Sequence, residues 1–162
     1  MLWLYALILL IVAVGLWAAY RVLGTPSRLA PGDYLVVLAD VATSVERSAT
    51  RLRQALEHEP DGRLGDVAAE ARKIFQTGYY QTLRLRPNDG PDAMAAARAE
   101  LGRACEAYDW ASRMIGSESR RNPLIRAAAL RLLDAGDAAL SQAARELPAG
   151  QRATRENSAP SA

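Results

Sequence analysis

The sequence predicts an all-α protein in which a single N-terminal transmembrane helix is followed by an up-down four-helix bundle. Two observations lead to this prediction. Residues 1–20 contain no charged side chain. Residues 33–147 carry apolar residues at heptad spacing and are divided by turn-forming sequences near residues 60, 89 and 120. Because short connections between helices of similar length make neighbours antiparallel, the four resulting segments are expected to alternate in direction.

Residues 1–23 are expected to form the membrane anchor. The apolar run from Leu2 to Tyr20 would extend about 28 Å as a helix, close to the roughly 30 Å hydrocarbon core of a bilayer. Trp3 and Trp17 lie near its two ends, where aromatic rings favour the membrane interface. A cleaved secretory signal is the alternative. It is disfavoured because no Lys or Arg precedes the run and because the run is too long.

Residues 24–32 read as a juxtamembrane linker, since Pro26, Pro31 and Gly32 interrupt any helix. Arg21 and Arg28 follow the apolar run, and only the α-amino group precedes it. Because arginines beside a span favour its cytoplasmic side, we expect a single-pass protein of the cell membrane with its soluble domain in the cytoplasm.

Residues 33–147 contain four heptad patterns. Asp33 offers a cap for the first helix, Pro91 opens the third, and Asn122 with Pro123 opens the fourth. The four expected core sets are Leu35, Leu38, Ala42, Val45, Ala49, Leu52 and Leu56; Leu64, Val67, Ala68, Ala71, Ile74, Phe75 and Gly78; Met94, Ala97, Leu101, Ala104, Tyr108, Ala111 and Ile115; and Ala129, Leu133, Gly136, Leu140, Ala143 and Leu147. Residues 148–162 have almost no apolar mass and are expected to be a disordered tail.

Composition argues against several functional classes. Residues 33–147 hold 16 basic and 17 acidic side chains, so the sequence predicts no basic patch and no nucleic-acid partner. Cys105 and His58 are the only cysteine and histidine, too few for a zinc, haem or iron–sulfur site. Because phosphate-binding glycine loops and nucleophile motifs are also absent, we expect no metal, no cofactor and no enzymatic activity.

Two groups of residues are candidate contact surfaces. In an up-down bundle the second interhelix loop returns toward the membrane, which would place Arg84 and Arg86 with Arg21 and Arg28 at an anionic lipid surface. An ordinary solvated helix end is the alternative for this group. Tyr79, Tyr80 and Trp110 form the second group, an aromatic surface for a protein partner, with packing against a neighbouring helix as the alternative.

The combination favours a single-pass, membrane-tethered helical bundle that acts through protein–protein contacts as a scaffold, adaptor or assembly factor. One alternative is a module that binds anionic lipid surfaces. Another is an extracytoplasmic sensory or stress bundle, which requires the opposite topology. Gly15 and Ala19 have the spacing of a helix-association motif, so a homo-oligomer is also open.

Overall fold

The computed structural model describes residues 2–23, 28–58, 61–87, 92–117 and 121–157. Within these residues the chain is mostly helical, with two very short strands and a few turn and connecting residues. The helices are α1 (Leu2–Leu23), α2 (Pro31–His58), α3 (Asp61–Arg84), α4 (Ala95–Ile115) and α5 (Pro123–Asn157), and the strands are β1 (Arg28–Leu29) and β2 (Arg86–Pro87). The predicted all-α class is therefore confirmed.

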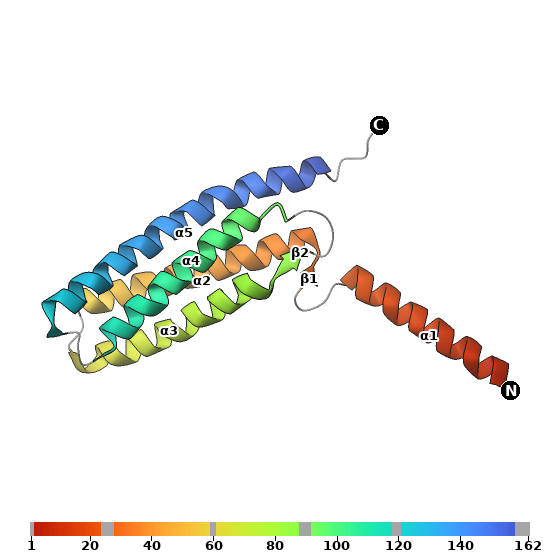
Figure 1. Ribbon diagram of the computed structural model, residues 1–162, viewed down its shortest axis with the longest axis horizontal. Helices are drawn as coiled ribbons and strands as arrows, with labels where there is room; N and C mark the ends of the chain where they lie inside the picture. Colours follow the sequence, from red (N-terminus) through yellow and green to blue (C-terminus); the bar gives the residue numbers. More distant parts are fainter. Residues whose placement is uncertain (1, 24–27, 59–60, 88–91, 118–120, 158–162) are drawn as a thin grey trace.

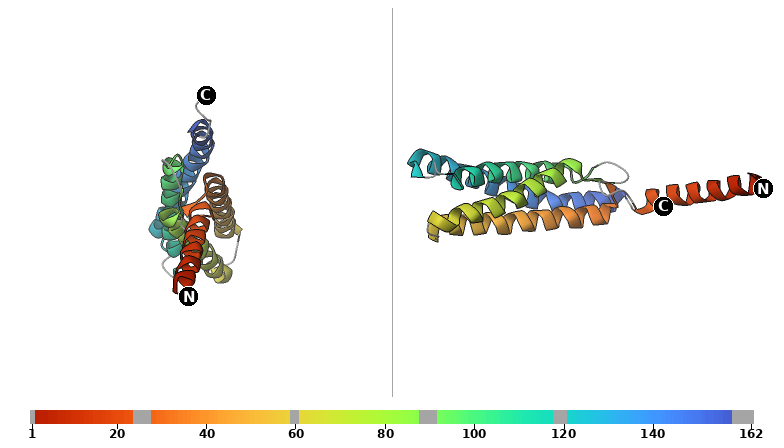
Figure 2. Two further views of the ribbon diagram at one scale, coloured as in Figure 1. Left: turned by 90° about the vertical axis from the view of Figure 1, so that its right-hand side faces the viewer. Right: turned by 90° about the horizontal axis from the view of Figure 1, so that it is seen from below.

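The helices α2 to α5 pack side by side in alternating directions, while α1 projects from one end of this bundle (Figures 1 and 2). α3 lies against α2 and α4, and α4 lies against α3 and α5. The contact between α2 and α5 is much less extensive than the contacts between the other neighbouring helices, α2 with α3, α3 with α4 and α4 with α5. Every described side chain of α1 is exposed. In the described parts of the chain, no helix is both long enough and apolar enough to cross a membrane.

α2 begins at Pro31, two residues before the predicted start of the bundle at Asp33. The amide of Tyr34 donates to the carbonyl of Ala30 at 2.8 Å, so the helix already has its first turn there. Proline suits this first position because its φ angle is fixed and it has no amide proton to satisfy. Asp33 lies in the first turn, where its charge favours the positive end of the helix dipole.

α3 and α4 are joined by a segment that differs from the prediction. α3 ends at Arg84, and Arg86 and Pro87 then pair in parallel with Arg28 and Leu29. α4 begins at Ala95, although the sequence favoured a start at Pro91, which lies outside the described residues. Asp92 causes the delay, because its side chain accepts the amide of Met94 at 3.2 Å and its carbonyl accepts the amide of Ala95 at 3.1 Å.

α5 begins as predicted and ends later. Asn122 accepts the amide of Leu124 at 2.9 Å, which confirms its capping role before Pro123. The helix continues past Pro148 to Asn157, so residues 148–157 are helical where the sequence favoured a disordered tail. The sequence prediction relied on the low apolar content of this stretch. Its Ala, Gln, Arg and Glu residues nevertheless have a high helix propensity, which favours continuation of the helix. Residues 158–162 lie outside the described part of the chain.

The core follows the heptad patterns most closely on α4, where the six predicted residues are buried together with Met94 just before the helix. On α2 the buried face is rotated from the predicted one. Leu38, Val45 and Leu52 are fully buried, but Tyr34 and Val41 replace Leu35 and Ala42, which are only half-buried. Because α5 lies less tightly against α2 than α3 does, the core side of α2 turns toward α3. On α3, Ile74 is 41% exposed rather than buried as predicted.

Two helix glycines mark close approaches between helices. A Cβ atom on Gly136 would lie 2.5 Å from Cε1 of Tyr108, so this ring packs directly on the backbone of α5. A Cβ atom on Gly78 would lie 3.0 Å from Sγ of Cys105 and 3.1 Å from Cγ2 of Val45. Gly78 therefore lets α3 approach both of its neighbours.

Candidate functional site

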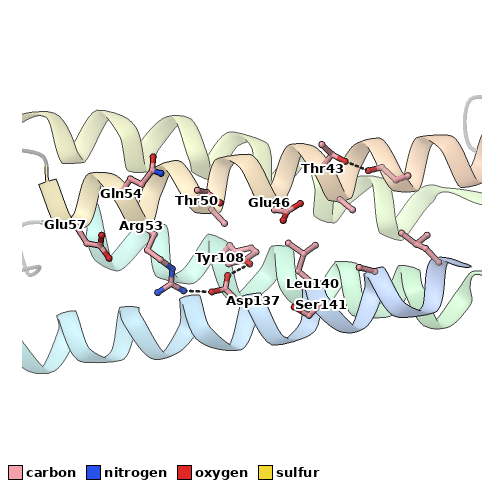
Figure 3. A pocket seen from close by; sticks show the side chains of 15 residues that line it. Thr43, Glu46, Thr50, Arg53, Gln54, Glu57, Tyr108, Asp137, Leu140 and Ser141 are labelled. Atoms are coloured by element: carbon pink, nitrogen blue, oxygen red, sulfur yellow. Dashed lines mark hydrogen bonds and ion pairs between the residues drawn. The ribbon is translucent and has the colours of Figure 1, made fainter.

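The loosely closed side of the bundle contains a groove between α2 and α5 with a volume of about 830 Å³ (Figure 3). We call it the α2/α5 groove. It is lined by Ala39, Ala42, Thr43, Glu46, Ala49, Thr50, Arg53, Gln54 and Glu57 of α2, by Tyr108 of α4, and by Asp137, Leu140, Ser141, Ala144 and Leu147 of α5. From residue 39 to residue 57 the groove follows α2 for about 27 Å, or five helical turns.

Tyr108 and Asp137 form the floor of the groove together with Arg53. The hydroxyl of Tyr108 donates to Oδ1 of Asp137 at 2.7 Å. Nη2 of Arg53 donates to Oδ2 of Asp137 at 2.5 Å and to Oδ1 of Asp134 at 3.2 Å. Figure 3 shows the three floor residues converging from three helices. Because both oxygens of Asp137 are engaged, this cluster holds α2, α4 and α5 in register beneath the groove.

The floor residues shift one another's protonation. Burial raises the pKa of Tyr108, and the neighbouring Asp137 carboxylate raises it further. Burial acts to lower the pKa of Arg53, but Asp137 and Asp134 outweigh this effect and raise it. At neutral pH, Tyr108 is therefore a fixed hydrogen-bond donor and Arg53 a fixed cation. A nucleophilic tyrosinate is therefore disfavoured here.

The walls of the groove carry two further carboxylates, Glu46 and Glu57, both exposed on α2. Glu46 has no hydrogen-bond or ion-pair partner among the described residues. Glu57 lies 3.9 Å from Nδ1 of His58, its neighbour in the chain. Together with Asp137 and Arg53 they give the lining a net formal charge of −2. The groove is therefore acidic.

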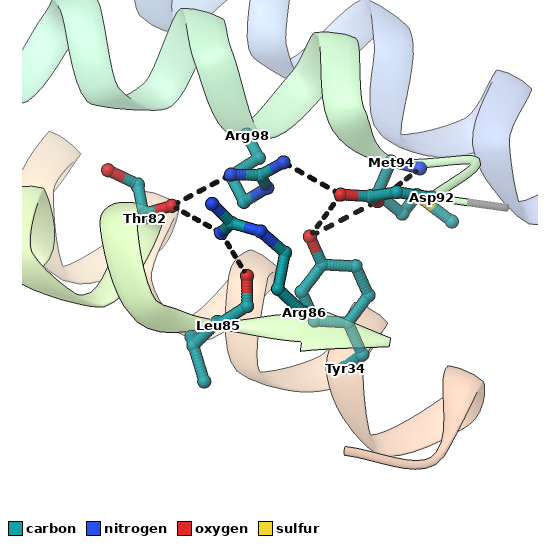
Figure 4. A network of polar contacts seen from close by, with 7 residues as sticks. All are labelled: Tyr34, Thr82, Leu85, Arg86, Asp92, Met94 and Arg98. Carbon is teal, nitrogen blue, oxygen red and sulfur yellow. Dashed lines mark hydrogen bonds and ion pairs between the residues drawn. The ribbon is translucent and has the colours of Figure 1, made fainter. Parts of the chain in front are cut away.

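A second polar cluster (Figure 4) lies where α2 begins, at the end of the bundle nearest α1 in Figure 1. The hydroxyl of Tyr34 lies 3.3 Å from Oδ1 of Asp92, and Nη2 of Arg98 donates to Oδ2 of Asp92 at 2.8 Å. Arg98 also donates to the carbonyl of Thr82 at 3.1 Å. Burial, followed by the Asp92 carboxylate, raises the pKa of Tyr34 to about 12. These contacts join α2, α3 and the start of α4, which gives the cluster a structural role.

The four arginines that the sequence assigned to a lipid surface are described only in part. Arg84 and Arg86 are exposed at the α1 end of the bundle. Arg86 donates to the carbonyl of Leu85 at 2.7 Å. The backbone of Arg28 pairs with that of Arg86, but its side chain lies outside the described part of the structure, as does that of Arg21. The backbone thus brings Arg28 and Arg86 together, whereas lipid contact stays a prediction.

The three residues of the predicted aromatic surface lie on two helices: the rings of Tyr79 and Tyr80 on α3 meet edge to face with their centroids 6.3 Å apart, and Trp110 lies on α4. Tyr79 is half-buried and packs against the core, while Tyr80 is 62% exposed. Trp110 is 51% exposed and lies beneath the guanidinium of Arg113, 5.2 Å from its ring centroid. Along the bundle axis, Trp110 lies at the height of residues 75 and 76 of α3. Phe75 stacks on Tyr108, and Nε2 of Gln76 donates a hydrogen bond to Oδ1 of Asp109. Tyr80 is more than one helical turn from that level.

Cys105 and the potential metal ligands can be placed in the described residues. Cys105 is fully buried, and burial raises the pKa of its thiol to about 12, so the thiol stays protonated and inert. Within the described ranges, no group of three or more His, Cys, Asp or Glu side chains could hold a metal ion.

Sequence reasoning missed the α2/α5 groove. It assigned Tyr108 to the core, where the ring does lie, and gave no role to Arg53 or Asp137. One available signal was the presence of charged residues one position beside the heptad seam, such as Arg53 beside Leu52 and Asp137 beside Gly136. In comparisons with known proteins, no family model, no curated protein and no solved structure matches this chain.

Proposed function

We propose that this protein is a membrane-tethered helical bundle that acts through protein–protein contacts, as an adaptor or assembly factor, and that the α2/α5 groove is its docking site. The observation that carries the proposal is the groove itself. Its walls are two antiparallel helices, and four of the residues that line it are alanines. A groove of this shape suits a helix laid along it, a common mode of peptide recognition.

The floor of the groove supports this function. Asp137 is held on both oxygens by Tyr108 and Arg53, so its position does not depend on a ligand. A pre-formed site lowers the cost of ordering side chains on binding. Leu140 and Leu147 are half-buried along the groove and offer apolar surface to a partner.

The membrane anchor is the part of the proposal that rests on the sequence, because no spanning helix is found among the described residues. The helix α1 runs from Leu2 to Leu23, and the uncharged run from Leu2 to Tyr20 within it extends about 28 Å. A second argument comes from exposure. Leu9, Ile11 and Leu16 are each more than 60% exposed, all the described side chains of this helix are exposed, and such an apolar surface is typical of a helix in a lipid or protein environment.

Site-specific photocrosslinking in living cells tests the proposed docking site. A photoreactive amino acid at Ser141 would face the groove, and one at Ala135 would lie on α5 outside it. We expect crosslinked protein products from position 141 and none from position 135. The absence of products at both positions, with the chain expressed and folded, would contradict the proposal.

A topology reporter fused after Ala162 tests the anchor and its direction. A cytoplasmic signal in the membrane fraction is expected, because Arg21 and Arg28 follow the apolar run. An external signal would favour the sensory alternative. Recovery of the chain in the soluble fraction would contradict the anchor.

Binding to anionic lipid is a second candidate function, favoured by the exposure of Arg84 and Arg86 at the α1 end. Each arginine near an anionic leaflet contributes about 1 kcal/mol. The double variant Arg84→Gln/Arg86→Gln should therefore weaken binding of the anchor-deleted chain to anionic vesicles by roughly tenfold or more. Zwitterionic vesicles supply the control. Unchanged binding would exclude this function.

A further inference from the structure

The two carboxylates on the α2 wall of the α2/α5 groove restrict the kind of partner that can bind there. Glu46 and Glu57 lie eleven residues apart on α2, which is about 16 Å and very close to three helical turns. Both side chains are exposed and border the groove. Figure 3 shows Glu46 near the middle of the groove and Glu57 toward its end farthest from α1.

Arg53, the one cation in the lining, is already neutralised. It lies between Glu46 and Glu57 in the chain but contacts the carboxylates of Asp134 and Asp137. It therefore leaves the negative charge of Glu46 and Glu57 uncompensated. Two separated carboxylates on one wall, without a cation of their own in the groove, would attract a ligand with two cationic groups at matching separation.

The shape of the groove restricts what carries those cations. A strand would need an exposed sheet edge, and in the described residues β1 and β2 are only two residues long and lie at the end of the bundle. The groove instead follows two antiparallel helices for about five turns. Ala39, Ala42 and Ala144 keep its walls low enough for a third helix to approach closely.

We infer that the groove binds a basic amphipathic helix of a partner protein. Its apolar stripe would cover the alanines and leucines of the groove, and two Arg or Lys side chains eleven residues apart would pair with Glu46 and Glu57. This inference rests on the proposed docking function and specifies the chemistry of the partner. The groove of a second copy fits poorly, because both surfaces would bring the same excess of negative charge.

A designed peptide pair tests the charge requirement. The probe is a fluorescent 18-residue Ala- and Leu-based helix with Arg at positions 4 and 15, and the matched peptide carries Glu at both positions. Binding to the full chain in zwitterionic nanodiscs is followed by fluorescence anisotropy, with empty nanodiscs subtracted. The Arg peptide should bind at least tenfold tighter than the Glu peptide, and the difference should shrink as salt is raised. Equal affinity, or no binding of the Arg peptide, overturns the inference.

Variants of the chain then locate the binding. Glu46→Gln/Glu57→Gln should weaken the Arg peptide by about five- to twentyfold, as expected for two solvent-exposed ion pairs. Glu106→Gln removes an exposed carboxylate of α4 outside the groove and should change nothing. The reversal Glu46→Arg/Glu57→Arg should make the Glu peptide the tighter ligand. All substituted positions are exposed, so circular dichroism should show unchanged folding.

A bulky substitution separates the failure of this inference from the failure of the proposed function. Ala42→Trp would fill the groove without changing its charge. Loss of binding in Ala42→Trp with no effect of the glutamate variants leaves the docking site in place but overturns the basic-helix chemistry. Binding that neither change affects lies outside the groove and overturns the inference, while crosslinking at Ser141 reports on the docking function independently. A dimer of the chain that Ala42→Trp abolishes would assign the groove to a second copy and also overturn it.

Discussion

Replacement of Gly136 by alanine should lower the stability of the bundle, although the same change elsewhere in a helix usually raises it. A Cβ atom at this position would lie 2.5 Å from Cε1, 2.7 Å from Cδ1 and 2.8 Å from Cζ of Tyr108. Ordinary contacts between carbon atoms are about 3.5–4.0 Å. The ring or the helix would therefore have to move by about 1 Å.

Tyr108 has little freedom to make that movement. Its ring is fully buried and stacks on Phe75 with a centroid separation of 5.1 Å. Its hydroxyl is held by Asp137. Overpacking of this kind costs about 1–3 kcal/mol, and the helix-propensity gain of alanine over glycine returns about 0.5–1 kcal/mol. The expected net change is a loss of roughly 1–2 kcal/mol in the free energy of unfolding.

Gly65 provides the matched control. It lies in α3, and a Cβ atom there would meet nothing within 4 Å. Gly65→Ala should therefore raise stability by about 0.5–1 kcal/mol through helix propensity alone. The two variants are predicted to change stability in opposite directions.

Urea unfolding of the full chain in detergent provides the assay. Trp3→Phe/Trp17→Phe leaves Trp110 as the only tryptophan, so fluorescence reports on the bundle. In a Tyr108→Val background, which lacks the three clashing ring atoms, Gly136→Ala should become neutral or stabilising. Stabilisation by Gly136→Ala in the unaltered background would show that the Tyr108 ring does not lie on Gly136, and would refute the reasoning.

Three further predictions concern the polar contacts. The raised pKa values of Tyr34 and Tyr108 keep both hydroxyls protonated in the folded state. The free energy of unfolding should therefore be constant through neutral pH and fall from about pH 10 upward, where tyrosines of the unfolded chain lose their protons. Tyr34→Phe should make this fall with pH less steep in urea titrations between pH 9 and pH 11.5. Asp92→Ala removes the acceptor shared by Tyr34 and Arg98, and should lower the free energy of unfolding by about 2–4 kcal/mol in the same assay. Arg51→Ala breaks an ion pair with Glu70 whose side chains are 67% and 64% exposed, so its effect should stay within about 0.5 kcal/mol, and a larger loss would mean that surface pairs contribute more than expected.

The sequence predicted the helices and much of the core because both depend on local pattern. α4 packs against helices on two sides, and its six predicted core residues and the preceding Met94 are all buried. The error on α2 has a physical cause. A heptad pattern identifies the apolar side of a helix, but the position of the neighbours decides which part of that side is covered. Ala42 belongs to the apolar seam of α2 and yet lines the groove, because α5 does not close over it.

The groove could not be predicted because it depends on the spacing between helices. Small residues on two helices are compatible with close packing, and Ala143 of α5 in fact is buried outside the groove. They are equally compatible with an open channel, as Ala39 and Ala144 show. Arg53 and Asp137 are 84 residues apart in the chain, so only the folded structure brings them together. The sequence suggested an aromatic surface, whereas the structure offers an acidic groove as the candidate site.

The geometry also bears on how a membrane anchor would affect binding at the groove. Exposed ion pairs and a groove lined partly by small alanine side chains give modest affinity, so a free basic helix should bind weakly. A partner held in the same bilayer would meet the groove at a much higher effective concentration, which raises apparent affinity without any new contact. Glu57 is about 39 Å along α2 from Pro31, the end nearest α1, and thus several Debye lengths away from it. Anionic headgroups at that end would therefore compete little with the Glu57 carboxylate for the cations of the partner.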